Sequence, residues 1–274
     1  MSKSQPIGVF DSGYGGLTVL KEIVASLPGY DFIYLGDNAR APYGNRSFET
    51  VYHYTLQCVQ WFFRMGSPLV ILACNTASAK ALRSIQQKDL PLIDGGKRVL
   101  GVIRPTTEII GNFSKTGNVG ILATAGTVQS ESYPIEIKKF FPEVRVFQQA
   151  CPMWVPLIEN NEQNTGGADF FIKKYIGELL AKGKDIDTIL LACTHYPLIR
   201  NKIQDHLSSA TTIVSQGEIV ARSLVDYLKR HPDIEKKCSK NGTRLFFTTD
   251  STTDFNQHAS IFYDESVEST HIDL

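Results

Sequence analysis

The chain has 274 residues, of which 42% are hydrophobic and 20% charged, and its 28 Lys and Arg residues balance 28 Asp and Glu residues. This length and composition are typical of a globular protein with one large or two moderate domains. The neutral charge argues against nucleic-acid binding, and no apolar run reaches the roughly 18–20 residues of a membrane span. The first residues also lack the apolar core of a secretory signal. From the charge and the apolar runs together we expect neither nucleic acid nor a membrane as partner.

The cysteines are Cys58, Cys74, Cys151, Cys193 and Cys238, without a CxxC pair. An odd number at wide spacing argues against a disulfide scaffold or a zinc site and is typical of a reducing compartment. We therefore expect a cytoplasmic protein without a bound metal. Each cysteine is by default a small buried apolar residue, and Cys58, Cys151 and Cys238, which have no partner motif, are assigned to structure or surface.

Short apolar runs alternate with helical patterns in the first part of the chain. Runs at 7–10, 31–37 and 68–74 predict strands, and apolar residues recur at helical spacing over 17–27 and 47–64. The run 68–74 is apolar almost throughout, as a strand buried on both faces should be. Such alternation predicts βαβ units, with a parallel sheet covered by helices on both faces.

The second part of the chain repeats this texture. Its predicted elements are strands at 119–124 and 143–150, a helix at 168–183, a strand within 187–197, a strand at 211–216, a helix at 217–231 and a strand at 243–251. VILACNTAS and TILLACTHY align with their Ala-Cys pairs superposed, and Gly8 and Gly120 are separated by a similar offset. This self-similarity indicates two homologous halves.

We therefore predict an α/β fold of two pseudo-symmetric domains, each a mostly parallel sheet flanked by helices, with the active site in the cleft between them. The first domain is predicted to comprise residues 1–95 with a returning segment 209–274, and the second residues 96–208. The polar, Gly-containing segment 89–101 gives the first boundary. In this architecture ligands bind at the carboxyl ends of the strands.

Cys74 and Cys193 stand at the same point of each half, after an apolar strand and before a helix. Either cysteine alone is readily explained as a core thiol. As a pair in facing halves, they would approach a ligand from opposite sides, and the helix N-termini beside them would favour a thiolate and a bound carboxylate. One thiolate can then remove a proton from a carbon while the other thiol returns one to the opposite face. This inverts a stereocentre without a cofactor.

Polar residues beside other strand ends are further candidates. Asp11, in FDSGYGGL, is either a helix N-cap or a carboxylate for a substrate ammonium or a neighbouring thiol. His195 is either an imidazole at the surface or one held by hydrogen bonds, or it is a charge partner for the nearby thiol. The loop 37–47 is either a plain turn or a binding loop, and Thr124 and Thr127 either cap a helix or bind a carboxylate.

The motifs FDSGYGGLTVL, DNARAPYG, LACNTAS, GILATAGT and LACTHYPL, in this order, resemble those of the glutamate racemases over about residues 7–250. The joint occurrence of ACNTAS and ACTHYP is highly specific. The resemblance implies a cofactor-independent, two-thiol interconversion of L- and D-glutamate that supplies D-glutamate for peptidoglycan. It also implies two α/β domains with the active site between them, and a homodimer.

By this resemblance, Cys74 would deprotonate D-glutamate and Cys193 L-glutamate. Asp11 and His195 would assist them, and Glu159 would be a further contact at the substrate amino group. The residues that the resemblance implies in substrate binding are Asp11, Ser12, Tyr43, Gly44, Asn75, Thr76, Thr124, Thr127, Thr194 and His195.

The chain departs from the family pattern near the predicted domain boundary. VIRPTTE (102–108) stands where relatives often have VIEPG or similar, so Arg104 replaces an acidic residue, and residues 94–100 look inserted. These departures bear on dimer geometry and regulation. Asn38, where Ser or Thr is usual, is a mild change.

Alternative functions remain open at this point. One is a two-thiol racemase of aspartate or another acidic amino acid, because one methylene in a pocket changes binding by only about 1–3 kcal/mol. Another is an amino-acid-binding regulatory module with structural thiols. A hydrolase built on Cys193 and His195 is disfavoured, because residues two apart rarely form the required pair and the second thiol would have no role.

Overall fold

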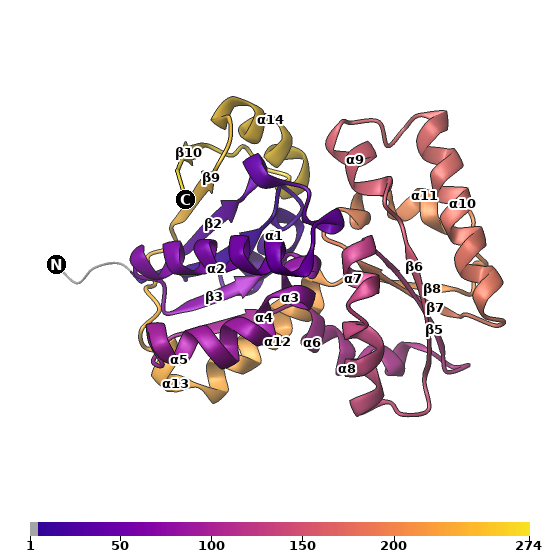
Figure 1. Ribbon diagram of the computed structural model, residues 1–274, viewed down its shortest axis with the longest axis horizontal. Helices are drawn as coiled ribbons and strands as arrows, with labels where there is room; N and C mark the ends of the chain where they lie inside the picture. Colours follow the sequence, from indigo (N-terminus) through magenta and orange to yellow (C-terminus); the bar gives the residue numbers. More distant parts are fainter. Residues whose placement is uncertain (1–4) are drawn as a thin grey trace.

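A computed structural model describes residues 5–274 and shows two α/β domains beside each other (Figure 1). The strands are β1 (Ile7–Asp11), β2 (Phe32–Gly36), β3 (Leu69–Leu72), β4 (Arg98–Gly101), β5 (Asn118–Ala123), β6 (Arg145–Ala150), β7 (Thr188–Ala192), β8 (Thr212–Val214), β9 (Arg244–Thr248) and β10 (Ser269–His271). The helices are α1 (Leu17–Ser26), α2 (Phe48–Arg64), α3 (Asn75–Lys80), α4 (Leu82–Ser84), α5 (Leu90–Ile93), α6 (Ile103–Thr107), α7 (Ala125–Gln129), α8 (Ser132–Phe140), α9 (Trp154–Glu159), α10 (Gly166–Lys182), α11 (Arg200–Gln204), α12 (Gly217–Arg230), α13 (Pro232–Glu235) and α14 (Thr252–Tyr263).

The strands form two sheets in which the pairings are parallel. The larger sheet has the order β10-β9-β2-β1-β3-β4 and the smaller the order β6-β5-β7-β8. In both, the first strand of the half lies between its second and third, and the fourth lies beside the third. The predicted α/β fold of two pseudo-symmetric parallel sheets is therefore confirmed, and β9 and β10 extend the first sheet.

The strand pairing corrects the predicted domain boundaries. β4 pairs with β3 in the larger sheet, and β8 pairs with β7 in the smaller one. The boundaries at 95/96 and 208/209 are therefore wrong by several residues, because the chain passes between the sheets after Gly101 and again after Val214. The segment 94–100, which looks inserted in the sequence, leads into β4, the edge strand of the first sheet. Its polar surroundings and shortness hide this strand in the sequence.

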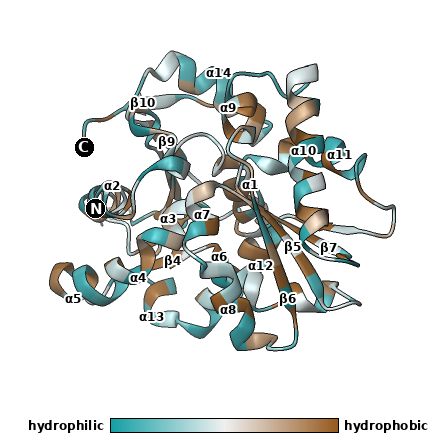
Figure 2. Cartoon of the chain, turned by 45° about the vertical axis from the view of Figure 1, so that its right-hand side comes forward, coloured by the Kyte–Doolittle hydropathy of each residue, from teal (hydrophilic) through white to brown (hydrophobic). Residues whose placement is uncertain are grey.

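Equivalent glycines let a helix pack closely on the first strand of each half. A Cβ at Gly8 in β1 would lie 2.5 Å from a ring carbon of Phe62 in α2, and one at Gly120 in β5 would lie 2.8 Å from a methyl group of Leu179 in α10. Both contacts are too short for any side chain. The apolar central strands and the helix faces against them form the core (Figure 2).

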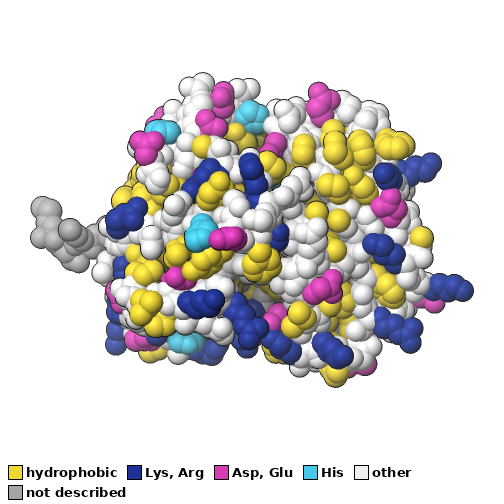
Figure 3. Space-filling view, in the orientation of Figure 1, with side chains coloured by type: hydrophobic (Ala, Val, Ile, Leu, Met, Phe, Trp, Pro, Cys, Tyr) yellow, Lys and Arg dark blue, Asp and Glu magenta, His cyan; other side chains and the backbone are white. Residues whose placement is uncertain are grey.

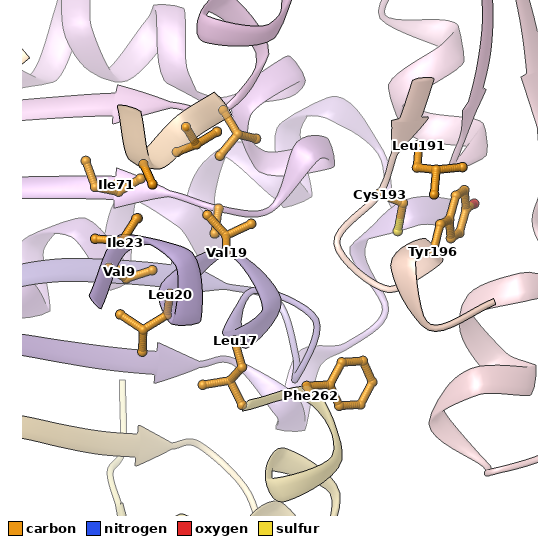
Figure 4. Close-up of a cluster of buried hydrophobic side chains, with 14 of the residues drawn as sticks. Val9, Leu17, Val19, Leu20, Ile23, Ile71, Leu191, Cys193, Tyr196 and Phe262 are labelled. Atoms are coloured by element: carbon orange, nitrogen blue, oxygen red, sulfur yellow. The ribbon is translucent and has the colours of Figure 1, made fainter. Parts of the chain in front are cut away.

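One buried apolar cluster continues across both domains. In the close-up of Figure 4, Leu17 and Phe262 lie on the first-domain side, and Leu191, Cys193 and Tyr196 lie on the second-domain side. This cluster packs the two domains together beside the carboxyl ends of their sheets.

The surface offers no single dominant feature on the face drawn in Figure 3, where acidic and basic side chains both occur. Apolar side chains gather there over α9 and α10, and Met153 and Phe170 are among the exposed apolar residues. Between residues 5 and 274, no helix combines the length and the apolar character needed to cross a membrane.

Candidate active site

A cavity of about 40 Å³ lies between the domains, walled by segments that follow β1, β2, β3, β5, β6 and β7. All the site residues predicted from the sequence line this cavity except Asp11 and Thr127. The cavity thus lies at the carboxyl ends of the strands in both sheets, where a doubly wound fold places its ligands.

Cys74 follows β3 and caps the first turn of α3. Its Sγ accepts a hydrogen bond from the Ala77 N–H at 3.5 Å and lies 3.5 Å from the Ser12 hydroxyl oxygen. Burial and then the nearby Asp11 carboxylate raise the pKa of the Cys74 thiol to about 12, against the opposing effect of these hydrogen bonds. Cys74 is therefore a neutral thiol at pH 7.

Asp11 lies behind the cavity wall at the end of β1 and is 1% exposed. One carboxylate oxygen accepts the Gly13 N–H at 3.0 Å, and the other accepts the Thr194 hydroxyl of the second domain at 3.3 Å. Burial raises the pKa of Asp11 above its usual value, while the positive charge of His195 lowers it. Asp11 is therefore connected to the cavity wall through the Thr194 hydroxyl.

Cys193 follows β7, and its Sγ lies 3.9 Å from Nδ1 of His195. The other ring nitrogen, Nε2, lies 2.8 Å from a carboxylate oxygen of Glu159, at the end of α9. A Cβ at Gly15 would lie 2.4 Å from the imidazole, so a glycine is required where the first domain meets this ring. The ring of Phe262 packs edge-on against the same imidazole, with centroids 5.3 Å apart.

The charge on His195 is set by its two partners. Burial by itself lowers the pKa of the imidazole, but the hydrogen bonds with Cys193 and Glu159, with the charge of Glu159, outweigh it and hold the pKa well above the ordinary 6.5. His195 is therefore an imidazolium at neutral pH. Cys193 Sγ therefore lies beside a positive charge, whereas the hydrogen-bonding partners of Cys74 Sγ described above, Ser12 and the Ala77 N–H, are neutral.

Threonine hydroxyls join the two domains at another part of the wall. Oγ1 of Thr76, from the first domain, lies 2.9 Å from Oγ1 of Thr124 and 3.4 Å from that of Thr127 in the second. Thr124 also caps α7 by accepting the Thr127 N–H at 3.2 Å. Thr127 is fully buried behind Thr124 and does not line the cavity. Hydroxyl groups in this arrangement can turn to donate to a carboxylate.

The loop after β2 brings Pro42, Tyr43, Gly44 and Asn45 to the cavity. The Tyr43 hydroxyl donates to the Asp37 carboxylate, which also accepts from Nε of Arg40 at 2.7 Å. A Cβ at Gly44 would lie 3.1 Å from the side chain of Thr124, so a larger residue there would press on the second domain. Because the Tyr43 hydroxyl is bonded to Asp37, the polar groups that this loop can offer to a ligand are its main chain and the Asn45 amide.

Pro42 and Asn45, from the predicted loop 37–47, also line the cavity, and so do Cys151, Pro152, Val155 and Pro156, which no sequence motif indicated. Cys151 is buried, and its thiol donates to the Gln149 carbonyl at 3.6 Å. Most of these residues follow β6. The rule that ligands bind at strand carboxyl ends would have found them if it had been applied to every predicted strand.

The described part of the chain has no cluster of His, Cys, Asp and Glu arranged to hold a metal ion. The free cysteines within it are all buried. The polar groups of the cavity are thiols, hydroxyls, amides, an imidazolium and a carboxylate, with apolar walls formed by Pro42, Val155 and Pro156. This set can bind a small zwitterion and move protons to and from it.

The family model described as Asp/Glu/Hydantoin racemase matches residues 7–224. The glutamate racemase of Geobacter metallireducens is 39% identical over 250 residues, which cover 91% of this chain and 89% of that protein. The crystal structure of a glutamate racemase from Bacillus anthracis has a TM-score of 0.89 at 32% identity, covering 99% of this chain and 98% of that one. The structure of glutamate racemase from Francisella tularensis in complex with D-glutamate has a TM-score of 0.87 at 29% identity, covering 99% and 98%.

The fold, the cavity and these likenesses together define an isomerase that acts on amino acids, an amino-acid racemase. More closely, the chain belongs to the glutamate racemases of the Asp/Glu/Hydantoin racemase family.

Proposed function

We propose that this protein interconverts L-glutamate and D-glutamate by proton transfer at Cα, with Cys74 on one face of the carbon and Cys193 on the other. The observation that carries the proposal is that two thiols from equivalent strand ends of two domains line one cavity. The relatives named glutamate racemases and the D-glutamate bound in the Francisella structure support glutamate as the substrate.

In the direction from L to D, Cys193 acts as a thiolate and takes the Cα proton, and the C–H electron pair stays on the carbon. Cys74, as a thiol, then gives its proton to the opposite face. The turn ends with a thiol at Cys193 and a thiolate at Cys74, so the reverse reaction begins from the state that the forward reaction leaves. The step moves only protons, so it needs no oxidant, reductant or further reactant.

The surroundings of the thiols suit these starting states. The imidazolium of His195, held by Glu159, stabilises a thiolate at Cys193, and the raised pKa of Cys74 keeps its proton available. Negative charge developing on the substrate would be stabilised by main-chain N–H groups at Asn75 and Thr194 and by the substrate ammonium. Preorganised groups of this kind supply much of the lowering of a barrier of this type.

Substrate recognition follows from the same wall. The hydroxyls of Ser12, Thr76 and Thr124 and the main chain at Gly44 would hold carboxylates. Glu159 and the buried charge of Asp11 would balance the ammonium. From the family we further propose a homodimer that supplies D-glutamate for peptidoglycan synthesis.

The test is the circular-dichroism signal of L-glutamate incubated with the purified protein and no added cofactor. The signal should decay to zero as the enantiomers equilibrate, and a Cys238→Ser variant, changed at a thiol outside the cavity, should give the same rate. Decay with L-aspartate but not with L-glutamate would move the substrate to the shorter acid. A constant signal with both would contradict the proposal and favour a binding module.

A further inference from the structure

Behind the cavity wall, three buried side chains form a closed ring of hydrogen bonds. Nδ2 of Asn75 donates to Oε1 of Gln216 at 2.7 Å, Nε2 of Gln216 donates to the Tyr133 hydroxyl at 2.8 Å, and that hydroxyl donates to Oδ1 of Asn75 at 2.5 Å. All three residues are almost fully buried, and only Asn75 lines the cavity.

The ring has one consistent direction. Each of the three groups donates once and accepts once, so turning either amide over would place donor against donor or acceptor against acceptor. Burial raises the pKa of Tyr133 well above its usual value, so its hydroxyl keeps the proton that it donates. Nε2 of Gln216 also reaches the Val102 carbonyl at 3.2 Å and the Thr106 hydroxyl at 3.0 Å.

The ring joins parts of the chain that belong to different domains. Asn75 begins α3 directly after Cys74, Tyr133 lies on α8 of the second domain, and Gln216 lies where the chain returns from β8 to α12. Val102 and Thr106 belong to the other crossing between the domains. Figure 1 shows α3, α6 and α12 together at this junction.

Thr194, which follows Cys193 in the second domain, is hydrogen-bonded to the first domain. The Thr194 carbonyl accepts the Thr18 hydroxyl of the first domain at 3.0 Å, and its own hydroxyl donates to Asp11. Each thiol is therefore followed by a residue that is hydrogen-bonded to the opposite domain. The two ties are made by different chemical groups, so they can be altered one at a time.

We propose that Tyr133 and Gln216 are positioning residues for Cys74. By holding the Asn75 side chain, they fix the Cys74–Asn75 peptide relative to the second domain, which carries Cys193, while Thr18 does the same for Cys193 from the first domain. Neither Tyr133 nor Gln216 touches the cavity, so both act through Asn75. The inference rests on the proposed two-thiol racemisation.

The test uses Tyr133→Phe, which removes one hydroxyl, and Thr18→Val as the matched change on the other side. The primary deuterium isotope effect on kcat/KM is measured with [2-²H]-D-glutamate and with [2-²H]-L-glutamate. Displacing Cys74 should make its proton transfer more rate-limiting, so in Tyr133→Phe the isotope effect rises with the D substrate and falls with the L substrate. In Thr18→Val the isotope effect should instead fall with the D substrate and rise with the L substrate.

The rate of Tyr133→Phe should fall roughly tenfold or more, since small misplacements of reacting groups are costly. Gln216→Met fills a similar space without the amide's hydrogen bonds and should show the same two changes in the isotope effects. It replaces Tyr133→Phe in the test if that variant fails to fold. Tyr52→Phe removes a hydroxyl bonded to Asp89, away from the cavity, and should change neither isotope effect.

A lower rate in Tyr133→Phe and Gln216→Met with both isotope effects unchanged would overturn the positioning role and leave racemisation intact. A wild-type protein that does not racemise glutamate would instead overturn the proposed function, and the inference with it.

Discussion

Cys74 follows the third strand of the first domain's sheet and Cys193 follows the third strand of the second, at positions that the repeated topology makes equivalent. Their neighbours differ. Cys74 meets the hydroxyl of Ser12 and a main-chain N–H, with the carboxylate of Asp11 nearby, whereas Cys193 meets the imidazolium of His195.

The difference shows which properties come from the fold and which from individual side chains. The duplicated sheet brings the two sulfurs to one cavity, but side chains from other loops set the charge around each. The two-thiol mechanism proposed above needs one thiolate and one thiol at the start of every turnover. An asymmetric pair of environments on a symmetric frame meets that need.

The largest effect should come from removing either sulfur. Cys74→Ser and Cys193→Ser should each lower the rate of racemisation by roughly 10²–10⁴-fold, because a hydroxyl is a far poorer acid and base here than a thiol. Polarimetry with both enantiomers measures this rate. Racemisation at the wild-type rate in either variant would contradict the claim that both thiols transfer protons.

Glu159→Gln should have the next largest effect and should act through His195. Removing the carboxylate lowers the raised pKa of the imidazole, so the imidazolium is lost at a lower pH than in the wild type. The rate at neutral pH should fall roughly tenfold or more, and the alkaline limb of its pH profile should move toward lower pH. Glu162→Gln, at an exposed residue three positions on, is the control. An unshifted alkaline limb would show that Glu159 does not govern this imidazole.

Ser12→Ala should have a smaller effect, and the part of it that concerns proton transfer should be confined to the Cys74 side. It removes one neutral hydrogen-bonding partner of the sulfur, which corresponds to a rate change of roughly two- to tenfold. The deuterium isotope effect should rise with D-glutamate and not with L-glutamate. Equal rises with the two enantiomers would mean that Ser12 serves both thiols.

Changes at the opposite ends of the strands should leave the rate almost unchanged. Asp31, just before β2, accepts the N–H groups of Asn241 and Thr243, and Asp187, just before β7, accepts those of Lys115 and Thr116. Asp31→Asn should lower the free energy of unfolding by about 1–3 kcal/mol, and Asp187→Asn by less because it is more exposed. Urea denaturation and a racemisation assay on the same samples check this, and a large loss of rate in the folded variants would contradict it.

Asp31 and Asp187 should also make the free energy of unfolding depend on pH. Burial by itself raises their pKa values, but hydrogen bonds from neighbouring loops outweigh it and hold both pKa values below the ordinary 3.8. Their stabilising effect is therefore present above that pH and is lost as the pH falls through the lowered values. Thermal melts of the wild type and of Asp31→Asn should converge as the solution is acidified below about pH 4.

Much of the frame was predictable because its signals are local. The apolar runs that end at Asp11, Cys74 and Cys193 are long enough to identify strands, and the repeated Ala-Cys pair indicates that two of them are equivalent. β4 was not found because its apolar residues, Val99 and Leu100, are too few to form a recognisable run.

The electrostatics of the site depend on contacts that no local pattern records. Glu159 reaches His195 across 36 positions of sequence, and Gln216 reaches Asn75 across 141. A glutamine in a loop looks the same whether it faces water or closes a buried ring. Such residues can be found only when the two crossings between the domains are placed in space.

The most direct test of the central claim is the exchange of the Cα proton in D₂O, followed by NMR, with Cys74→Ser and each enantiomer in turn. If each thiol serves one face, exchange should persist at a reduced rate from L-glutamate, where Cys193 remains as the base, and should be lost from D-glutamate. Equal exchange from both enantiomers would contradict the assignment of one sulfur to each face.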